Sequence, residues 1–176
     1  MEYLTMGTPG LGQELTQQVR ALLWDAFDDF SEHDWQHALG GVHVVAIDEG
    51  HVIGHASIIS RPVSIGELTE SAGYLEAVAV AADHQRQGIG TVVVRAVEQV
   101  LKDTYPFGVL STSRHRFYER LGWRRWQGPT FAVEGDQRRR TADEDDGIMV
   151  RAGNRAFAVS DLSLPIAVES RPGDDW

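Results

Sequence analysis

The segment QRQGIG at residues 85–90 constrains the fold of this chain more than any other feature, because of what flanks it. Before it, residues 73–80 (GYLEAVAV) are apolar and rich in strand-forming types. After it, residues 88–103 carry apolar side chains at helical spacing, so the sequence predicts strand, turn and helix in that order. Glycines let a ligand approach the backbone closely, and the free amides and positive end of a helix N-terminus attract phosphate oxygens. The turn therefore predicts a pyrophosphate cradle, with Arg86 adding a charge-assisted contact at its rim.

Other phosphate-binding turns fit this segment less well. The dinucleotide fingerprint Gly-x-Gly-x-x-Gly does not match its spacing, and a P-loop needs Gly-Lys-Ser/Thr, which is absent here. An ordinary helix start that happens to contain two glycines is the plain structural alternative. The strand before the turn and the helix after it favour the binding turn.

The rest of the chain predicts one α/β domain, since 176 residues suffice for a single full-sized core. Helices are expected over residues 14–27, 31–38 (with Ser31 as N-cap), 88–103 and 114–121. Strands are expected over residues 42–48, 52–60, 73–80, 107–111, 123–133 (interrupted at Gly128-Pro129), 148–151 and 157–164. Residues 7–12 are expected to form a flexible end, residues 137–147 a loop, and residues 62–71 a strand and a turn. This order predicts a mixed α/β sandwich around one sheet.

Composition excludes several classes of function. The formal charge is 16 − 26 = −10, whereas a nucleic-acid partner would need a basic face. There is no cysteine, which excludes a disulfide frame, a thiolate zinc site and a Cys nucleophile. The histidine pairs His33/His37 and His51/His55 lack a metal-binding context and are expected to be structural or exposed, so no metal is expected. No secretory leader and no run of roughly 20 apolar residues is visible, which predicts a cytoplasmic protein with no membrane partner.

Two motifs give the chain a resemblance to the GNAT superfamily of N-acetyltransferases. Residues 85–90 match the family signature Gln/Arg-x-x-Gly-x-Gly/Ala, and residues 116–123 (RFYERLGW) resemble its Phe-Tyr-x-x-x-Gly-Phe stretch. The resemblance implies a GNAT fold over residues 1–176 as one domain: a mixed, mostly antiparallel sheet with flanking helices and a splayed central strand. It also implies acetyl-CoA as co-substrate, with the strand backbone on the pantetheine arm and the turn amides on the pyrophosphate. The implied cofactor-binding residues are Val78, Ala79, Val80, Gln85, Arg86, Gln87, Gly88, Ile89 and Gly90.

A closer resemblance, to the aminoglycoside 2′-N-acetyltransferases, rests on several stretches in the same order along the chain. These are residues 30–35 (FSEHDW), 37–43 (HALGGVH), 73–78 (GYLEAV), 126–129 (WQGP), 145–147 (DDG) and 173–176 (GDDW). It implies acetylation of the 2′-amine of a cationic aminosugar, of the gentamicin–tobramycin group or kasugamycin, and hence antibiotic resistance. Acidic stretches at residues 25–34, 143–146 and 174–175 agree with a polycationic acceptor, although each alone is typical of a solvated surface. A homodimer is expected from the superfamily.

The resemblance also assigns roles to residues. Amine acetylation needs a base that takes a proton from the attacking amine and an acid for the leaving thiolate. Glu76, charged within an apolar strand, is the implied base, acting through water, and Tyr118 is the implied acid. The alternatives are that Glu76 only anchors a substrate ammonium and that Tyr118 only packs. The amides of residues 78–80 are candidates to stabilise the tetrahedral oxyanion. The implied substrate-binding residues are Asp29, Asp34, Glu76, Ser111, Asp145, Asp146, Asp174 and Trp176.

Two other functions stay open at this point. One is a GNAT enzyme that acetylates another small polyamine or a protein amine. The other is a CoA-binding module without catalysis, against which the presence of both Glu76 and Tyr118 argues. The basic run at residues 138–140 is expected at the surface, with the rim of an adenine 3′-phosphate site as the alternative.

Overall fold

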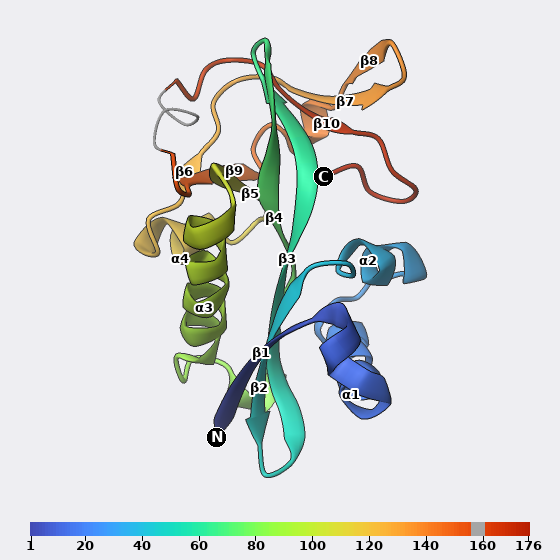
Figure 1. Cartoon of the computed structure of the whole chain (residues 1–176), viewed down its shortest axis with the longest axis vertical. Coiled ribbons are helices and arrows are strands. Elements are labelled where there is room, and N and C mark those ends of the chain that lie inside the picture. The colour runs from blue at the N-terminus through green and yellow to red at the C-terminus, as the bar shows by residue number, and fades with distance from the viewer. Residues whose placement is uncertain (156–160) are drawn as a thin grey trace. The chain divides into compact units, whose positions relative to one another are not determined.

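The structure is a computed structural model that describes residues 1–155 and 161–176 (Figure 1). Contacts within the chain divide it into two compact units, each made of two segments. Unit 1 comprises Met1–Ile59 and Leu75–Val100, and unit 2 comprises Ser60–Tyr74 and Leu101–Trp176. Strands β3 (His51–Ile65) and β4 (Leu68–Val80) and helix α3 (Ile89–Thr104) each contribute residues to both units.

Unit 1 is an antiparallel sheet with helices on both faces. Strands β1 (Glu2–Gly7), β2 (Val42–Asp48) and β3 pair in that order, each antiparallel to the next. In Figure 1, α1 (Gly12–Ala26) and α2 (Glu32–His37) lie on one side of these strands and α3 lies on the other. One face of α1 is buried because its apolar residues recur at helical spacing. The core on this side contains Leu11, Val19, Leu22, Leu23, Trp35, Val45, Val52 and Ala79.

The beginning of the chain differs from the sequence prediction. Residues 7–12 were expected to be a flexible end, but β1 pairs along its whole length with β2, and a 3₁₀ helix η1 (Thr8–Leu11) follows directly. Pro9 suits the first turn of that helix, and Leu11 is buried in the core. The backbone amide of Thr8 donates to the Gly41 carbonyl at 3.1 Å. Glycine content alone therefore misled the prediction, because these tertiary contacts fix the segment.

The start of α2 follows the sequence prediction. Ser31 is the N-cap, and its hydroxyl accepts from the Asp34 amide at 3.3 Å. The Asp34 carboxylate in turn accepts from the Ser31 amide at 2.7 Å, which completes a capping box. Asp34, predicted to bind substrate, thus has a local structural task as well.

Unit 2 is a mixed sheet with strand order β6-β9-β5-β4-β3-β10-β7-β8. β4 and β5 pair in parallel, as do β7 and β10. The antiparallel pairs are β3 with β10, β5 with β9, β6 with β9 and β7 with β8. Its strands are β5 (Phe107–Ser111), β6 (Arg124–Arg125), β7 (Thr130–Glu134), β8 (Gln137–Arg140), β9 (Ile148–Ala152) and β10 (Ile166–Glu169). Helix α4 (His115–Arg120) follows β5, the 3₁₀ helix η3 (Ala142–Glu144) follows β8, and η2 (Ala82–His84) precedes α3 in unit 1.

Some strand limits of the sequence prediction are confirmed and others are wrong. The strand and turn expected over residues 62–71 are confirmed: strand lies on both sides of a two-residue turn at Gly66, where φ is +60°. The loop expected over residues 137–147 is wrong at its start, because the polar β8 pairs with β7. The interruption expected at Gly128-Pro129 within the strand over 123–133 is confirmed, since β6 ends at Arg125 and β7 begins at Thr130. Of the strand expected over 157–164, residues 157–160 lie outside the described residues, and 161–164 form a turn before β10.

Among the described residues, no helix is both long and apolar enough to cross a membrane.

Gly54 on β3 tests how the start of α3 is held in unit 1. A Cβ at this position would lie 2.8 Å from Ile89 Cγ2 and 3.2 Å from Ala46 Cβ. Because Ile89 is buried at the first residue of α3, we expect Gly54→Ala to lower the free energy of unfolding by about 1–3 kcal/mol. Gly7→Ala is the control, since its Cβ meets only ordinary contacts at 3.7 Å or more. Urea denaturation measures both, and equal stabilities for the two variants would contradict this packing.

Candidate active site

Strand β4 leaves its regular extended path at Ala77, directly after Glu76. Ala77 has a φ of +52°, in the left-handed region that costs a residue with a Cβ about 1–2 kcal/mol. Side chains of β3 bind the two carbonyls at this break: Ser57 Oγ donates to the Glu76 carbonyl at 3.2 Å, and His55 Nδ1 lies 2.8 Å from the Ala77 carbonyl. In a regular ladder these carbonyls would bond backbone amides of a neighbouring strand. Ala77 thus interrupts the regular extended conformation of the central strand.

His55 is the inner end of a buried chain of hydrogen bonds in unit 1. Its Nε2 lies 3.0 Å from His43 Nδ1, and His43 Nε2 lies 2.8 Å from Thr8 Oγ1. The backbone amide of Gly40 donates to the same Thr8 oxygen at 2.9 Å. The register of β2 and β3 places His43 opposite Ser57, so His55 is the diagonal neighbour of His43 on one face of the sheet.

Both imidazoles are fully buried and neutral. Burial lowers the pKa of His43 to about 4 and that of His55 to about 3. For His55 the hydrogen bond to the Ala77 carbonyl opposes the shift, and the neighbouring His43 adds to it. Neither side chain is therefore positively charged near neutral pH.

The turn that the sequence singled out forms the N-terminus of α3. Arg86 and Gly88 both adopt left-handed backbone conformations, with φ of +62° and +89°. The side-chain amide of Gln85 donates through Nε2 to the Val80 carbonyl at 3.2 Å and so ties the turn to the end of β4. The first hydrogen bond of the helix runs from Val92 N to the Gly88 carbonyl at 3.1 Å. The amides of residues 89–91 precede this bond and lie at the positive end of the helix, where an anion binds.

In unit 2, Tyr118 lies on α4 among aromatic side chains. Its ring meets those of Phe117 and Trp123 edge-on, with centroids 4.9 and 6.1 Å away. Burial raises the pKa of its hydroxyl well above the ordinary value, and Arg114 opposes this shift. The hydroxyl therefore keeps its proton throughout the neutral range.

Ser111 and Asp174 both act on Glu144, a residue with no role predicted from the sequence. Ser111 Oγ, at the end of β5, donates to Glu144 Oε2 at 3.2 Å. Burial raises the pKa of Glu144, and the charges of Asp174, Asp143 and Asp175 raise it further. These carboxylates thus lie close enough to repel one another, which favours a cation among them.

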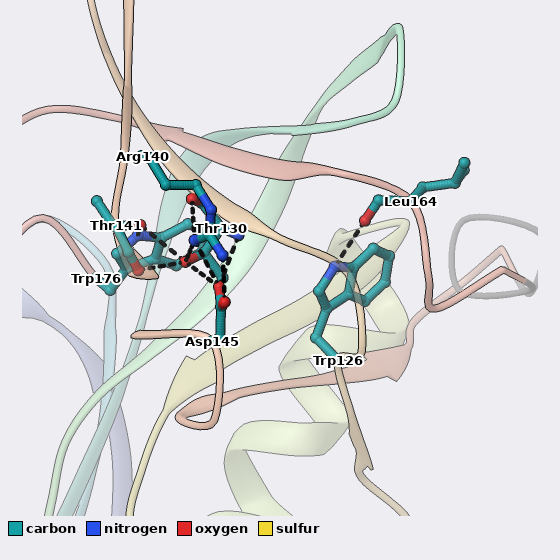
Figure 2. Close-up of polar contacts among 7 residues, drawn as sticks. All are labelled: Trp126, Thr130, Arg140, Thr141, Asp145, Leu164 and Trp176. Carbon is teal, nitrogen blue, oxygen red and sulfur yellow. Dashed lines mark hydrogen bonds and ion pairs between the residues drawn. The ribbon is translucent and has the colours of Figure 1, made fainter. Parts of the chain in front are cut away.

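Asp145 and Trp176 are joined by a hydrogen-bonded chain within unit 2 (Figure 2). The indole of Trp176 donates to Thr141 Oγ1 at 3.0 Å, and Thr141 Oγ1 donates to Thr130 Oγ1 at 2.9 Å. The Thr130 hydroxyl lies 2.9 Å from Asp145 Oδ1 and 2.6 Å from the Thr141 carbonyl. Arg140 binds both carboxylate oxygens of Asp145 and lowers its pKa to about 2. The charge of Asp145 is therefore compensated within the unit.

The two remaining predicted acids are exposed. Asp29 lies in the turn after α1, and Asp146 lies before β9 with its backbone carbonyl 2.6 Å from His115 Nε2.

The basic run on β8 is exposed and makes contacts inside unit 2. The Arg138 guanidinium lies 3.9 Å from the centre of the Phe131 ring, Arg139 pairs with Asp175, and Arg140 pairs with Asp145.

The structure places some of the predicted site residues on consecutive parts of one strand and turn, and it adds residues that were not predicted. Glu76 lies at the break in β4, which leads through residues 78–80 into the turn at 85–90. His43, His55 and Glu144 were missed. The histidines left a signal, since each occupies an inward position of an apolar strand, where a polar residue needs a bonded partner.

The profile of the acetyltransferase (GNAT) family matches residues 11–123. The aminoglycoside 2′-N-acetyltransferase of Mycolicibacterium fortuitum is 39% identical over 173 residues, which cover 96% of this chain and 89% of that protein. The chain belongs to the GNAT family of acetyltransferases. It is therefore an acetyltransferase, and within GNAT it belongs to the family of the M. fortuitum enzyme.

Solved structures show the same fold. The GNAT family N-acetyltransferase YhbS from Escherichia coli, in complex with CoA, matches with a TM-score of 0.68 and 17% identity, over 96% of this chain and 90% of that one. Eis1 from Mycobacterium abscessus matches with a TM-score of 0.61 and 16% identity over 74% of this chain. This chain spans about a third of the length of Eis1, with 33% of it covered. The α/β GNAT fold predicted from the sequence is confirmed.

The buried histidines predict how stability depends on pH. Their pKa values in the folded chain, about 4 and about 3, lie below the unfolded value of about 6.5. Between these values the unfolded chain binds more protons, so acid favours unfolding. We expect the free energy of unfolding to fall by about 3 kcal/mol between pH 6.5 and pH 5, measured by urea denaturation. The exposed His51→Asn variant should show the same slope, and a flat profile in both proteins would contradict burial of neutral histidines.

The network in Figure 2 predicts that Asp145 contributes to stability. In Asp145→Ala the Thr130 amide, which bonds Asp145 Oδ1 at 3.0 Å, loses this acceptor, and the Arg140 guanidinium loses its carboxylate partner. We expect a loss of about 1–3 kcal/mol in the free energy of unfolding. The adjacent, exposed Asp146→Ala is the matched control and should stay within about 0.5 kcal/mol of the parent. Equal losses for the two variants would show that the network is not stabilising.

Proposed function

We propose that this acetyltransferase moves the acetyl group of acetyl-CoA onto the 2′-amine of an aminoglycoside antibiotic and so confers resistance. The observation that carries the proposal is the 39% identity, across nearly the whole chain, to the M. fortuitum protein of that name. The net charge of −10 fits an acceptor that bears several positive charges.

Acetyl-CoA is proposed to bind along the end of β4 and the turn before α3. The amides at the N-terminus of the 16-residue α3 suit the pyrophosphate, because the helix end is positive and its amides lie outside the helical hydrogen bonds. The backbone of Val78, Ala79 and Val80, beyond the break at Ala77, suits the amide groups of the pantetheine arm. The CoA complex of YhbS, which has the same fold, supports CoA as the ligand.

The proposed reaction is a direct transfer. The neutral amine attacks the thioester carbonyl carbon, a C–N bond forms, and the C–S bond breaks as the tetrahedral intermediate collapses. The proton from the nitrogen passes through a water molecule to the Glu76 carboxylate. Backbone amides past Ala77 are proposed to stabilise the oxyanion that forms on the carbonyl oxygen.

Tyr118 is the proposed proton donor to the CoA thiolate. Burial keeps its hydroxyl protonated at neutral pH, which is the state an acid must start in. Since its pKa lies above that of a thiol, about 8.5, the hydroxyl begins by donating a hydrogen bond to the departing sulfur. Transfer of its proton to the thiolate is uphill in pKa and is completed when solvent returns a proton to the tyrosinate.

The proposed contacts to the acceptor are acidic side chains other than Asp145, whose charge Arg140 compensates. In unit 2 these are Glu144 and Asp174, with Ser111 as a hydroxyl partner, and the exposed Asp146. In unit 1 they are Asp29 and Asp34. Asp145 and Trp176 are proposed to support this region of unit 2 through the network in Figure 2.

A thiol-release assay tests the acceptor directly. Acetyl-CoA is supplied with tobramycin, gentamicin and kasugamycin, with an aminoglycoside that carries a 2′-hydroxyl, and with spermidine and a peptide N-terminus as other amines. We expect turnover with 2′-amino compounds and none with the 2′-hydroxyl compound, and mass spectrometry of the product should place the acetyl group on the 2′ nitrogen. Turnover only with spermidine or the peptide would overturn the aminoglycoside assignment while leaving acetyl transfer intact.

Two substitutions test the proposed acid and base. We expect Glu76→Gln to lower kcat about 10²- to 10³-fold and Tyr118→Phe about 10- to 10²-fold, with the melting temperature of each little changed. The same chemical changes at Glu134, exposed at the end of β7, and at Tyr105 serve as controls and should leave kcat within about 2-fold. Full activity in Tyr118→Phe would refute its role as the acid.

A further inference from the structure

The chain Thr8–His43–His55 has only one consistent direction of hydrogen bonding. A backbone carbonyl can only accept, so His55 Nδ1 carries the proton bound by the Ala77 carbonyl. The neutral His55 then accepts at Nε2 from His43 Nδ1–H, and His43 accepts at Nε2 from the Thr8 hydroxyl. Both histidines are therefore neutral with the proton on Nδ1. The Thr8 hydroxyl has a second acceptor, the Gly41 carbonyl, but at 3.5 Å against 2.8 Å to His43.

This chain ends on the peptide group that joins Ala77 to Val78. The peptide is trans, so its carbonyl and its amide point in opposite directions. When His55 holds the Ala77 carbonyl, the Val78 amide must point to the opposite side. Ser57 binds the Glu76 carbonyl in the same way and fixes the preceding peptide. The backbone on both sides of the strained Ala77 is thus held by side chains of β3.

We infer that Thr8, His43 and His55 are positioning residues for acetyl transfer: they hold the Ala77 carbonyl so that the Val78 amide and Glu76 face the reacting thioester. The inference rests on the function proposed above. The left-handed conformation of Ala77 costs free energy, and a fixed carbonyl acceptor offsets that cost. Because both histidines are neutral, these hydrogen bonds hold the Ala77 carbonyl without placing a charge beside Glu76. A charged imidazole there would attract the Glu76 carboxylate.

Nitrogen-15 NMR of the histidine side chains tests the hydrogen bonds of Thr8, His43 and His55 without any substrate. We expect two histidines with protonated Nδ1 and unprotonated Nε2 that do not titrate between pH 8 and pH 5.5. In Thr8→Val, which removes one hydroxyl, the Nε2 resonance of His43 should shift while that of the exposed His51 stays in place. Protonated Nε2 on His55, or titration of either histidine near pH 6.5, would overturn the inference whatever the acceptor proves to be.

Substitutions of His55 test the effect on catalysis. Leucine removes the donor, whereas asparagine places its amide nitrogen near the position of Nδ1 and keeps it. We expect His55→Leu to lower kcat about 10²-fold and to shift the Val78 amide resonance, with the Kd for CoA within about 3-fold of the parent. His55→Asn should recover kcat to within about 5-fold, and His51→Asn should match the parent.

The outcomes separate the inference from the proposed function. A purely structural role would lower stability, kcat and CoA affinity together in His55→Leu, without recovery by asparagine, and would overturn the inference. If the parent protein acetylates no aminoglycoside, the proposed function fails, and the kinetics are then measured with whichever amine turns over. If no amine turns over, the Val78 amide resonance decides: a shift in His55→Leu that asparagine reverses supports the positioning role, and an unshifted resonance refutes it. If His55→Leu does not fold, Thr8→Val and His55→Asn carry the same comparison.

Discussion

The chemistry proposed for this chain depends on one hydrogen bond, from His55 Nδ1 to the Ala77 carbonyl. A strand that continued in regular pairing would use its amides on its neighbours and present none to a ligand. The left-handed Ala77 interrupts this pairing between Glu76 and the segment that runs into the turn before α3. The left-handed conformation of Ala77 is unfavourable by itself, so other groups must stabilise it. His55 and Ser57 on β3 do so by binding the carbonyls of Ala77 and Glu76.

The same principle organises the two units separately. In unit 1 a buried polar chain runs from Thr8 to the Ala77 carbonyl, and in unit 2 another runs from the Trp176 indole to Asp145. Each begins at a group that donates and ends at one that accepts. Within each of these chains every group has a hydrogen-bond partner, so the chain favours one arrangement of the surrounding side chains. A single substitution at either end leaves a polar group without its partner and lowers stability.

The sequence predicted the elements whose signals are local. The turn at residues 85–90, α3 and the cap at Ser31 were all confirmed, because glycine spacing, apolar periodicity and capping chemistry act over a few residues. The ordered start of the chain and the polar strand β8 were missed, because each is fixed by pairing with another strand. Partners far apart in sequence, such as Thr8 with His43 and Thr141 with Trp176, could not be predicted from composition or local pattern. The roles of Glu76 and Tyr118 remain predictions.

Backbone amide NMR during titration with CoA tests most directly whether the broken strand and the turn form the cofactor site. The largest shifts, and the strongest protection from hydrogen exchange, should fall on the amides of Val78 and Val80 and on those of residues 88–91. The exposed hairpin turn at Glu49 and Gly50 should remain unchanged. Binding of CoA that is measurable by calorimetry but leaves the amides of β4 and the α3 N-terminus unperturbed would contradict the proposed cofactor site.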